Sequence, residues 1–258
     1  MILRRLAHSL KEQNWTTILV EFVLLVCGVF LGIQAANWNE TRRERALESE
    51  YITRLQRDFR AIDARLAINL TRWENTAAAT IRLINDLDAF RQRRAWPRAK
   101  AEMLGDLDAA MGSRIPAPRA ASYVELLSAG RLGLLRDIRL RDALADYDTQ
   151  AGFTMKAYDV LVQRVDPQRP TLVRHMRYDR GADAAQMDPE EILRNGGEPW
   201  ADVDLAQLGS DPGLETALNT FASASHGQVL NARLQQGKAK AVITLLEPYA
   251  KRAEDKQQ

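Results

Sequence analysis

The side chains best suited to chemistry are sparse and scattered along this 258-residue chain. The three histidines, His8, His175 and His226, do not lie at the spacing of a metal site, and Cys27 is the single cysteine. One cysteine can form neither an intramolecular disulfide nor a cysteine zinc site within the chain. No serine lies in a Gly-x-Ser-x-Gly motif, and no glycine-rich phosphate loop occurs. The sequence therefore predicts a non-enzymatic protein with no cofactor.

Aspartates separated by one residue include Asp86 and Asp88, Asp106 and Asp108, and Asp202 and Asp204. The first two pairs fall in segments with helical patterns, where residues two apart point in different directions. The third pair falls in a loop-like region and could bind a divalent cation, but no third ligand follows at calcium-loop spacing. We therefore expect these carboxylates to be solvated surface groups.

A basic cluster of Arg91, Arg93 and Arg94 precedes Trp96. Such a cluster is a candidate contact for an anionic lipid or polymer. It is equally typical of a solvated helix end, where cations interact favourably with the helix dipole. The chain as a whole carries a formal net charge of only +2. No global basic field is therefore available to attract nucleic acid.

Residues 15–38 form an apolar run bounded by Trp15 and Trp38, with Glu21 as its one ionisable residue. A helix of about 23 residues is roughly 34 Å long, enough to cross a hydrocarbon core of about 30 Å. The two tryptophans lie where interfacial aromatic anchors are expected. The run is longer than the apolar core of a signal peptide, so we favour an uncleaved transmembrane helix with the lipid bilayer as its first partner. Residues 1–14 predict either an amphipathic helix on the bilayer surface or a disordered tail.

One face of this transmembrane helix combines small residues with the carboxyl group. At about 100° per residue this face contains Glu21, Leu25, Gly28, Gly32 and Ala35. Small residues allow helix backbones to approach, and a polar group in lipid seeks a partner. The face predicts a homo-oligomer or association with another membrane protein. The alternatives are that the glycines reflect the general frequency of glycine in spans, and that Glu21 lies near the headgroups.

The basic residues that flank the span are equal in number on its two sides, so they do not determine its orientation. Three basic residues flank each end: Arg4, Arg5 and Lys11 on one side, and Arg42, Arg43 and Arg45 on the other. The positive-inside rule therefore gives no clear answer at short range. Long domains translocate with little regard to charge, so this balance does not forbid export of the domain. We favour a cytoplasmic N-terminus and a periplasmic domain.

Residues 40–94 contain neither proline nor glycine and predict a long helix that leaves the membrane and ends near Trp96-Pro97. Its apolar residues recur at spacings of three and four: Ile52, Leu55, Phe59, Ile62, Leu66, Trp73, Leu83, Leu87 and Phe90. Asn69, Thr76 and Thr80 continue the same register with polar groups. This heptad-like seam predicts either a coiled-coil stalk or a helical hairpin that buries the seam in its own domain. The polar seam positions favour the hairpin.

The remaining sequence also predicts helices, which we place at residues 98–111, 122–129, 137–165, 171–178 and 211–250, the last with a break near Gly227. Gly130 is suited to end one helix and Asp137 to cap the next. Residues 179–213 hold much of the glycine and proline and are a candidate subdomain junction. No segment alternates long enough to predict a strand. The fold class is mainly α: a transmembrane helix at 15–38, a long exit helix, and a helical bundle within a soluble domain at 39–258.

Two stretches together resemble a known family. The first is Gly28-Val29-Phe30-Leu31-Gly32-Ile33-Gln34 with the exit motif Asn37-Trp38-Asn39-Glu40, and the second is Leu126-Leu127-Ser128-Ala129-Gly130-Arg131-Leu132-Gly133-Leu134-Leu135-Arg136-Asp137. They resemble an uncharacterised bacterial family of single-span inner-membrane proteins, defined only as a domain of unknown function. The resemblance implies a bacterial inner-membrane helical protein. It implies no activity, cofactor or catalytic residue.

Two functions fit these features. The first is a membrane-anchored scaffold or accessory subunit that acts through oligomerisation, as the small-residue face suggests. The second is a sensory or ligand-binding helical module that signals through a membrane partner. The second requires a cytoplasmic output element, and residues 1–14 are too few to provide one.

Overall fold

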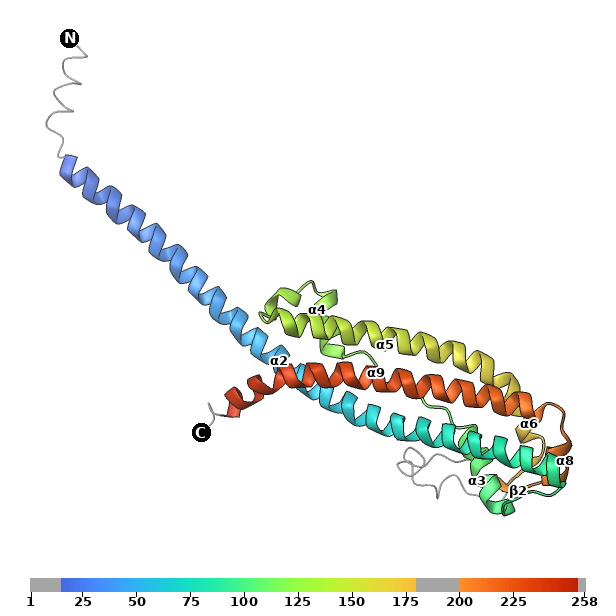
Figure 1. Cartoon of the computed structure of the whole chain (residues 1–258). Coiled ribbons are helices and arrows are strands. Elements are labelled where there is room, and N and C mark those ends of the chain that lie inside the picture. Colours follow the sequence, from blue (N-terminus) through green and yellow to red (C-terminus); the bar gives the residue numbers. More distant parts are fainter. Residues whose placement is uncertain (1–14, 180–199, 255–258) are drawn as a thin grey trace, which may run out of the picture. The chain divides into compact units, whose positions relative to one another are not determined.

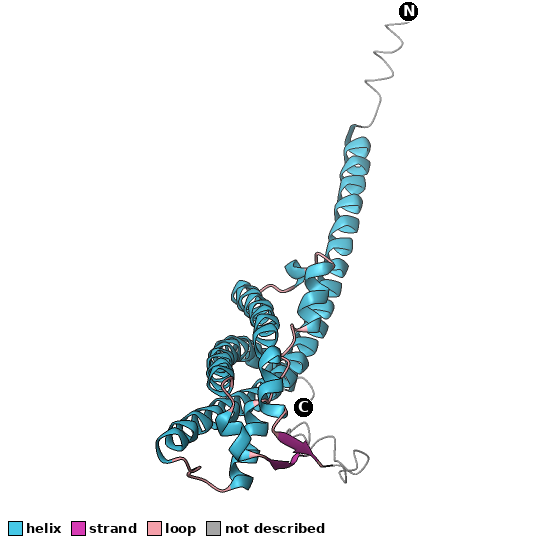
Figure 2. Cartoon of the chain, turned by 90° about the vertical axis from the view of Figure 1, so that its right-hand side faces the viewer, coloured by secondary structure: helices cyan, strands magenta, loops and turns pink. Residues whose placement is uncertain are grey.

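The computed structural model describes the backbone of residues 15–179 and 200–254, and side chains at 19–179 and 200–250. The chain is mainly helical, as the sequence predicts (Figure 2). The amphipathic segment predicted at residues 1–14 lies outside the described part. So does most of the candidate junction at 179–213.

The chain divides into two compact units, Met1–Tyr51 and Ile52–Gln258. Residues on both sides of the candidate junction belong to the second unit. The helix α2 (Trp15–Arg93) contributes to both units, and its two parts are described separately.

In the first unit, α2 contains an apolar stretch long enough to cross a membrane. Its best 18-residue window has a mean hydropathy of 2.2, and none of that window is buried within the chain. A core helix of a water-soluble protein would bury such a stretch, because exposed apolar surface of this size is unfavourable in water. The prediction of one helix that is long and apolar enough to span a bilayer is therefore confirmed for the described residues.

In the second unit, α2 from Ile52 onward lies beside α5 (Ile138–Val165) and α9 (Leu214–Glu254) (Figure 1). Three contacts join α2 to α9 in antiparallel register: Gln56 Nε2 donates to the Leu246 carbonyl at 3.0 Å, Glu74 pairs with Arg233 at 2.7 Å, and Arg91 pairs with Glu215 at 2.7 Å. On the other flank of α9, Lys238 pairs with Asp146 of α5 at 2.7 Å. The three long helices thus form the frame of the unit.

The heptad-like seam of α2 is buried inside this unit. Eight of its apolar residues are at most 6% exposed: Ile52, Leu55, Phe59, Ile62, Leu66, Trp73, Leu83 and Leu87. The Phe59 ring meets the Tyr147 ring of α5 edge to face, with centroids 4.9 Å apart. The seam is therefore covered by the chain's own helices, as the hairpin alternative expects. The coiled-coil stalk is not supported, because the face that would pair with a second copy is already occupied.

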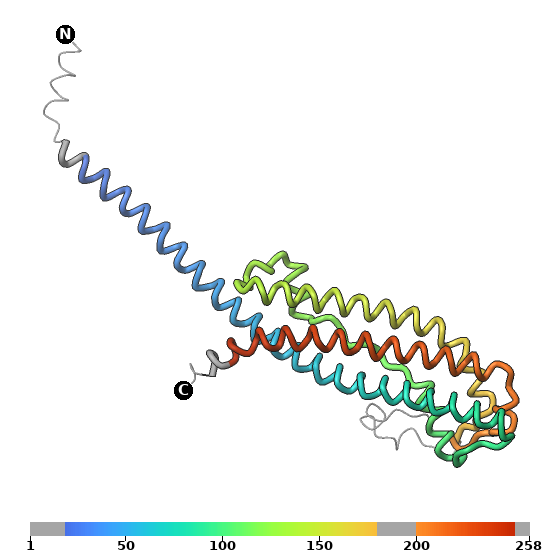
Figure 3. The backbone as a smooth tube through the Cα atoms, in the orientation of Figure 1, coloured from blue at the N-terminus to red at the C-terminus, as the bar shows by residue number. Residues whose placement is uncertain are grey.

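A connecting segment (residues 112–120) fills the place where a four-helix bundle would have its fourth helix. It joins α3 (Lys100–Ala110) to α4 (Ala121–Ser128) and runs back along the long helices (Figure 3, green). Asn69 of α2 is hydrogen-bonded to Ile115, and Asp58 of α2 is hydrogen-bonded to Ser122 at the start of α4. Between these two contacts α2 advances by eleven residues and the connecting chain by only seven. Eleven helical residues are about 16 Å long and seven only about 10 Å, so the segment is more extended than a helix. Pro116 and Pro118 explain this, because proline disrupts helical hydrogen bonding.

Each long helix donates a side-chain hydrogen bond to a backbone carbonyl of the connecting segment. Asn69 of α2 donates to Ile115 at 3.0 Å, Tyr147 of α5 donates to Pro118 at 2.9 Å, and Gln235 of α9 donates to Ala117 at 3.1 Å. Gln235 also donates to the Tyr147 hydroxyl at 3.1 Å. A buried carbonyl without a partner is costly, so these donors compensate for the helical hydrogen bonds that the segment lacks. The polar positions in the seam of α2 thus have a structural explanation.

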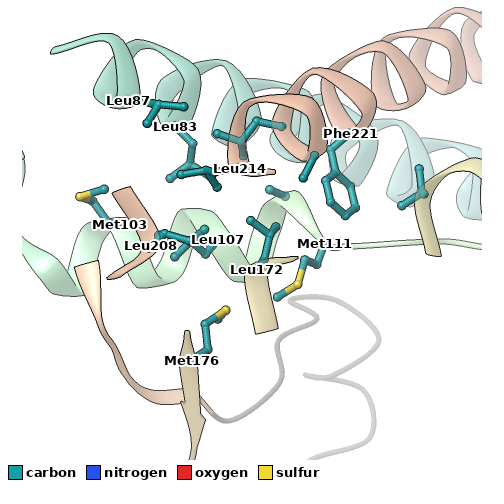
Figure 4. Close-up of a cluster of buried hydrophobic side chains, with 14 of the residues drawn as sticks. Leu83, Leu87, Met103, Leu107, Met111, Leu172, Met176, Leu208, Leu214 and Phe221 are labelled. Atoms are coloured by element: carbon teal, nitrogen blue, oxygen red, sulfur yellow. The ribbon is translucent and has the colours of Figure 1, made fainter. Parts of the chain in front are cut away.

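The far end of the second unit is closed by short elements around an apolar cluster. These elements are α3, α6 (Arg169–Val173), β1 (Met176–Tyr178), β2 (Trp200–Val203) and α8 (Leu205–Ser210). Figure 4 shows Leu107, Leu172, Leu208 and Phe221 converging there from four helices. Trp96 stacks on Phe90 with centroids 4.6 Å apart and donates to the Leu205 carbonyl at 2.8 Å. These contacts hold the end of α2 against α8.

Several predicted boundaries are confirmed. The predicted helices at 98–111, 122–129 and 137–165 correspond to α3, α4 and α5, with short 3₁₀ turns at Leu132–Leu134 and Asp166–Gln168. Gly130 has a φ of 65°, a left-handed conformation that glycine adopts without strain. Asp137 caps α5 by accepting from the Arg139 amide at 2.9 Å.

Two predictions are wrong, and one strand pairing was not predicted. The helix expected at 171–178 ends at Val173, and Met176–Tyr178 instead pairs antiparallel with Trp200–Val203. Strands of three and four residues are too short to produce a detectable alternation, so the sequence pattern missed them. The break expected near Gly227 is also absent, since α9 continues through it. The adjacent Gln228 is 3% exposed, and packing of this face outweighs the weak helix propensity of one glycine.

We expect Gln235→Leu to lower the free energy of unfolding by about 1–3 kcal/mol, because the Ala117 carbonyl loses its donor in a buried site. Gln236→Leu is the matched control, since Gln236 is only partly buried. Urea unfolding of the full-length protein in detergent, followed by circular dichroism, measures both. Equal midpoints for the two variants would show that the donor is unimportant.

Candidate association site and charged groups

The predicted association face lies on the first part of α2. Its residues Glu21, Leu25, Gly28, Gly32 and Ala35 follow at spacings of four, three, four and three, and all are exposed. A helix with 3.6 residues per turn places this series on one face. A Cβ atom added at Gly28 or Gly32 would meet no heavy atom within 4 Å. Nothing within the described chain therefore requires glycine at these two positions.

The chemistry of this face differs from that of the helix around it. Large apolar side chains elsewhere on the same stretch, such as Phe22, Leu24 and Phe30, are about 60% exposed. Such side chains suit contact with lipid tails, whereas glycine and alanine allow another helix to approach closely. Glu21 places one carboxyl group on the small-residue side. A carboxyl group in lipid is costly unless it finds a hydrogen-bonding partner.

The three arginines of the basic cluster have different surroundings. Arg91 is engaged with Glu215 and thereby joins the end of α2 to the start of α9. Arg94 has a φ of 56°, and its amide donates to the Phe90 carbonyl at 2.7 Å, so its backbone ends the helix. Arg93 is exposed. The structure therefore does not bring Arg91, Arg93 and Arg94 together as a common anion site.

Asp86 and Asp106 are buried, which corrects their assignment as solvated groups. Their side chains are 8% and 10% exposed. Arg98 pairs with Asp86 at 2.5 Å and with Asp106 at 2.7 Å, and Arg82 adds a second pair with Asp106 at 2.5 Å. The network joins the last turns of α2 to α3. The sequence pattern missed it because aspartates two apart do not meet each other, yet each can meet an arginine from another element.

The charges in this network shift one another's pKa values. Burial raises the pKa of Asp106, but hydrogen bonds from Arg82 and Arg98 outweigh this effect and lower it below its usual range. The hydrogen bond to Asp86 raises the pKa of Arg98 further above its already high value. Asp106 therefore stays ionised over the physiological pH range.

The remaining candidate carboxylates have structural partners as well. Asp108 accepts from the Trp200 indole at 3.1 Å, and Asp202 pairs with Lys100 at 2.5 Å. Asp204 caps α8 by accepting from the Gln207 amide at 3.1 Å. Within residues 19–179 and 200–250, no three histidine, cysteine, aspartate or glutamate side chains gather where they could hold a metal ion. The cation site considered for Asp202 and Asp204 is therefore not assembled.

His175 belongs to a pair that the sequence did not reveal. Its Nε2 atom lies 2.8 Å from Asp211 Oδ2, and both side chains are about 10% exposed. Asp211 also accepts from the Gly213 amide at 2.8 Å, next to the start of α9. Hydrogen bonds from His175 and then from Gly213 lower the pKa of Asp211. This pair fastens α6 to α9 and has the geometry of a structural contact.

Tyr147 and Gln235 are the other important residues that the sequence analysis missed. Both are at most 1% exposed. Burial raises the pKa of Tyr147 to about 12, so its hydroxyl stays protonated and available as a donor at neutral pH. The polar interruptions at Asn69 and Thr76 were the available hint that polar partners lie between the helices.

No protein-family model, curated protein or solved structure matches this chain. The resemblance to a bacterial inner-membrane family therefore stays a prediction, and the functional conclusions rest on the chain itself.

We expect the protein to lose stability as the pH falls below about 4. Asp106 and Asp211 have folded-state pKa values below their unfolded values of about 3.9, so their contribution is present above that pH and is lost as each is protonated in the folded state. Melting temperatures measured between about pH 2 and pH 7 test this, with Asp106→Asn expected to flatten the acidic limb. A melting temperature that stays constant throughout would contradict the assignment.

Proposed function

We propose that this protein is a single-pass membrane protein that acts by association, as a scaffold or accessory subunit. Its α2 segment at residues 15–38 would anchor it, with the bacterial inner membrane as the membrane and the second unit on the periplasmic side. The face of Glu21, Leu25, Gly28, Gly32 and Ala35 would contact a second copy or another transmembrane helix.

The observation that supports this proposal is the exposed small-residue face on an exposed apolar helix. A Cβ atom at either glycine would meet no heavy atom within 4 Å among the residues that the structure describes, and the stretch is too apolar to remain in water. Close helix–helix contact at small residues gives a physical use to both features. A protonated Glu21 could then donate a hydrogen bond across the contact, which satisfies its polar group in lipid.

The charged side chains of the second unit support association over catalysis. Asp86 and Asp106 are held in a network with two arginines, Asp204 and Asp211 stabilise helix starts, and Asp108 and Asp202 have partners on neighbouring elements. Carboxylates engaged in this way fix the fold. We propose no catalytic residue and no cofactor.

We expect Gly28→Leu and Gly32→Leu each to weaken self-association about tenfold, because the larger side chain keeps the two backbones apart. Energy transfer between donor- and acceptor-labelled full-length protein, diluted stepwise with lipid in vesicles, gives the dissociation constant. Cys27→Leu is the matched control, since it enlarges a small exposed residue on a different face of the same helix.

A specific complex that all three substitutions leave unchanged would place the contact elsewhere. Energy transfer no greater than that expected for random proximity in wild-type vesicles would contradict self-association. In that case co-purification with a second membrane protein, weakened by the same two glycine substitutions, would be required to retain the proposal.

A further inference from the structure

The turn from α4 into α5 lies at the end of the second unit where α2 enters it (Figure 1). Asp58 of α2 accepts from the amide of Ser122 at the start of α4, and Arg54 of α2 pairs with Glu125 three residues later. The helix α4 therefore runs antiparallel to α2, toward the N-terminal side of α2. We call residues 126–142 the α4–α5 corner, which comprises the end of α4, a 3₁₀ turn and the start of α5.

The α4–α5 corner combines positive charge with exposed aliphatic side chains. It contains four arginines and two aspartates, so its formal net charge of +2 equals that of the whole chain. The arginines are Arg131, Arg136, Arg139 and Arg141. Arg131 is exposed, and the side chain of Arg139 is 82% exposed. Leu127 and Ile138 are 45% and 61% exposed. Basic and aliphatic side chains exposed together are typical of segments that contact an anionic lipid surface.

The length of α2 limits how far the corner can lie from the bilayer. Arg54, which pairs with α4, follows Trp38 by sixteen residues of the same helix, or about 24 Å. The helix α4 turns back over part of this length, and the headgroup layer extends about 6 Å beyond the hydrocarbon core. Transmembrane helices tilt by about 20° on average, and a tilt toward the corner would shorten the remaining distance. The corner is therefore within reach of the membrane surface.

We propose that the α4–α5 corner contacts the anionic headgroups of the bilayer in which α2 is anchored. The exposed arginines would pair with lipid phosphates, and Leu127 and Ile138 would lie beside them against the surface. A weak contact is enough, because the anchor holds the corner at a high local concentration of lipid. The contact would select one tilt of α2. This inference rests on the proposed membrane anchorage and adds a lipid surface as a partner of the second unit.

The test measures how closely the corner approaches the lipid. Full-length protein with Cys27→Ala carries a donor dye at Ser128→Cys, an exposed position at the end of α4. It is placed in nanodiscs at one copy per disc, so that self-association does not contribute, together with a headgroup-labelled acceptor lipid. One set of discs contains phosphatidylcholine alone, and the other contains equal parts of phosphatidylcholine and phosphatidylglycerol. A donor at Ser210→Cys, exposed at the end of α8, reports on the other end of the unit.

We expect energy transfer from Ser128→Cys to be about twofold higher in the discs with phosphatidylglycerol. The increase should disappear in about 1 M salt, where the Debye length is only about 3 Å. Arg131→Glu and Arg139→Glu should each remove at least half of it. Arg93→Glu is the matched control, since Arg93 is also exposed but lies at the opposite end of the second unit. It should leave the increase unchanged.

Equal energy transfer in the two kinds of disc would overturn the proposal. So would an increase that both corner variants retain, or one that Arg93→Glu removes to the same extent. An increase of the same size at Ser210→Cys would show that the whole unit approaches the lipid, and would also contradict a contact at the corner. Recovery of the protein outside the discs would instead contradict the membrane anchorage, so the two failures can be distinguished.

Discussion

The second unit depends on how it satisfies the backbone of a partly buried, non-helical segment that lies along its long helices. A helix provides its own hydrogen-bond partners, whereas residues 112–120 must obtain theirs from side chains. Asn69, Tyr147 and Gln235 supply them, one from each long helix. The three helices are thereby fixed to one segment, and through that segment to each other.

This arrangement explains both the inside and the outside of the unit. Inside, polar residues occupy positions that apolar residues would normally fill, since a carbonyl without a donor would cost more than the lost apolar contact. Outside, a pocket of about 220 Å³ lies between α2 and this segment. The far end depends on the separate network of Arg82 and Arg98 with Asp86 and Asp106, which fixes the turn from α2 into α3.

The first unit follows a simpler rule. An exposed apolar helix is stable in lipid because all of its backbone hydrogen bonds are internal, and its side chains then divide into lipid-facing and helix-facing types. In the proposed association, Glu21, Gly28 and Gly32 would lie on the helix-facing side.

Helical periodicity was readable from the sequence, but contacts between residues distant in sequence were not. Period and capping residues located α2, α4 and α5, because a helix is defined by residues close in sequence. The pairing of Met176–Tyr178 with Trp200–Val203, the burial of Asp86 and the reach of Gln235 to Ala117 all join residues distant in sequence. No spacing rule contains that information. The exposed stripe around Gly28 was readable, because a single helix determines which residues share a face.

The most direct test of the central constraint is a double-mutant cycle on Asn69 and Gln235. Their side chains hold different carbonyls of the same segment, at Ile115 and Ala117, from helices α2 and α9. When one donor is removed, the segment becomes less ordered, and the remaining hydrogen bond stabilises the fold less. The loss in unfolding free energy of the double variant should therefore differ from the sum of the losses for Asn69→Leu and Gln235→Leu by about 1 kcal/mol. Losses that add to within about 0.3 kcal/mol would show two independent contacts and contradict a segment that couples the helices.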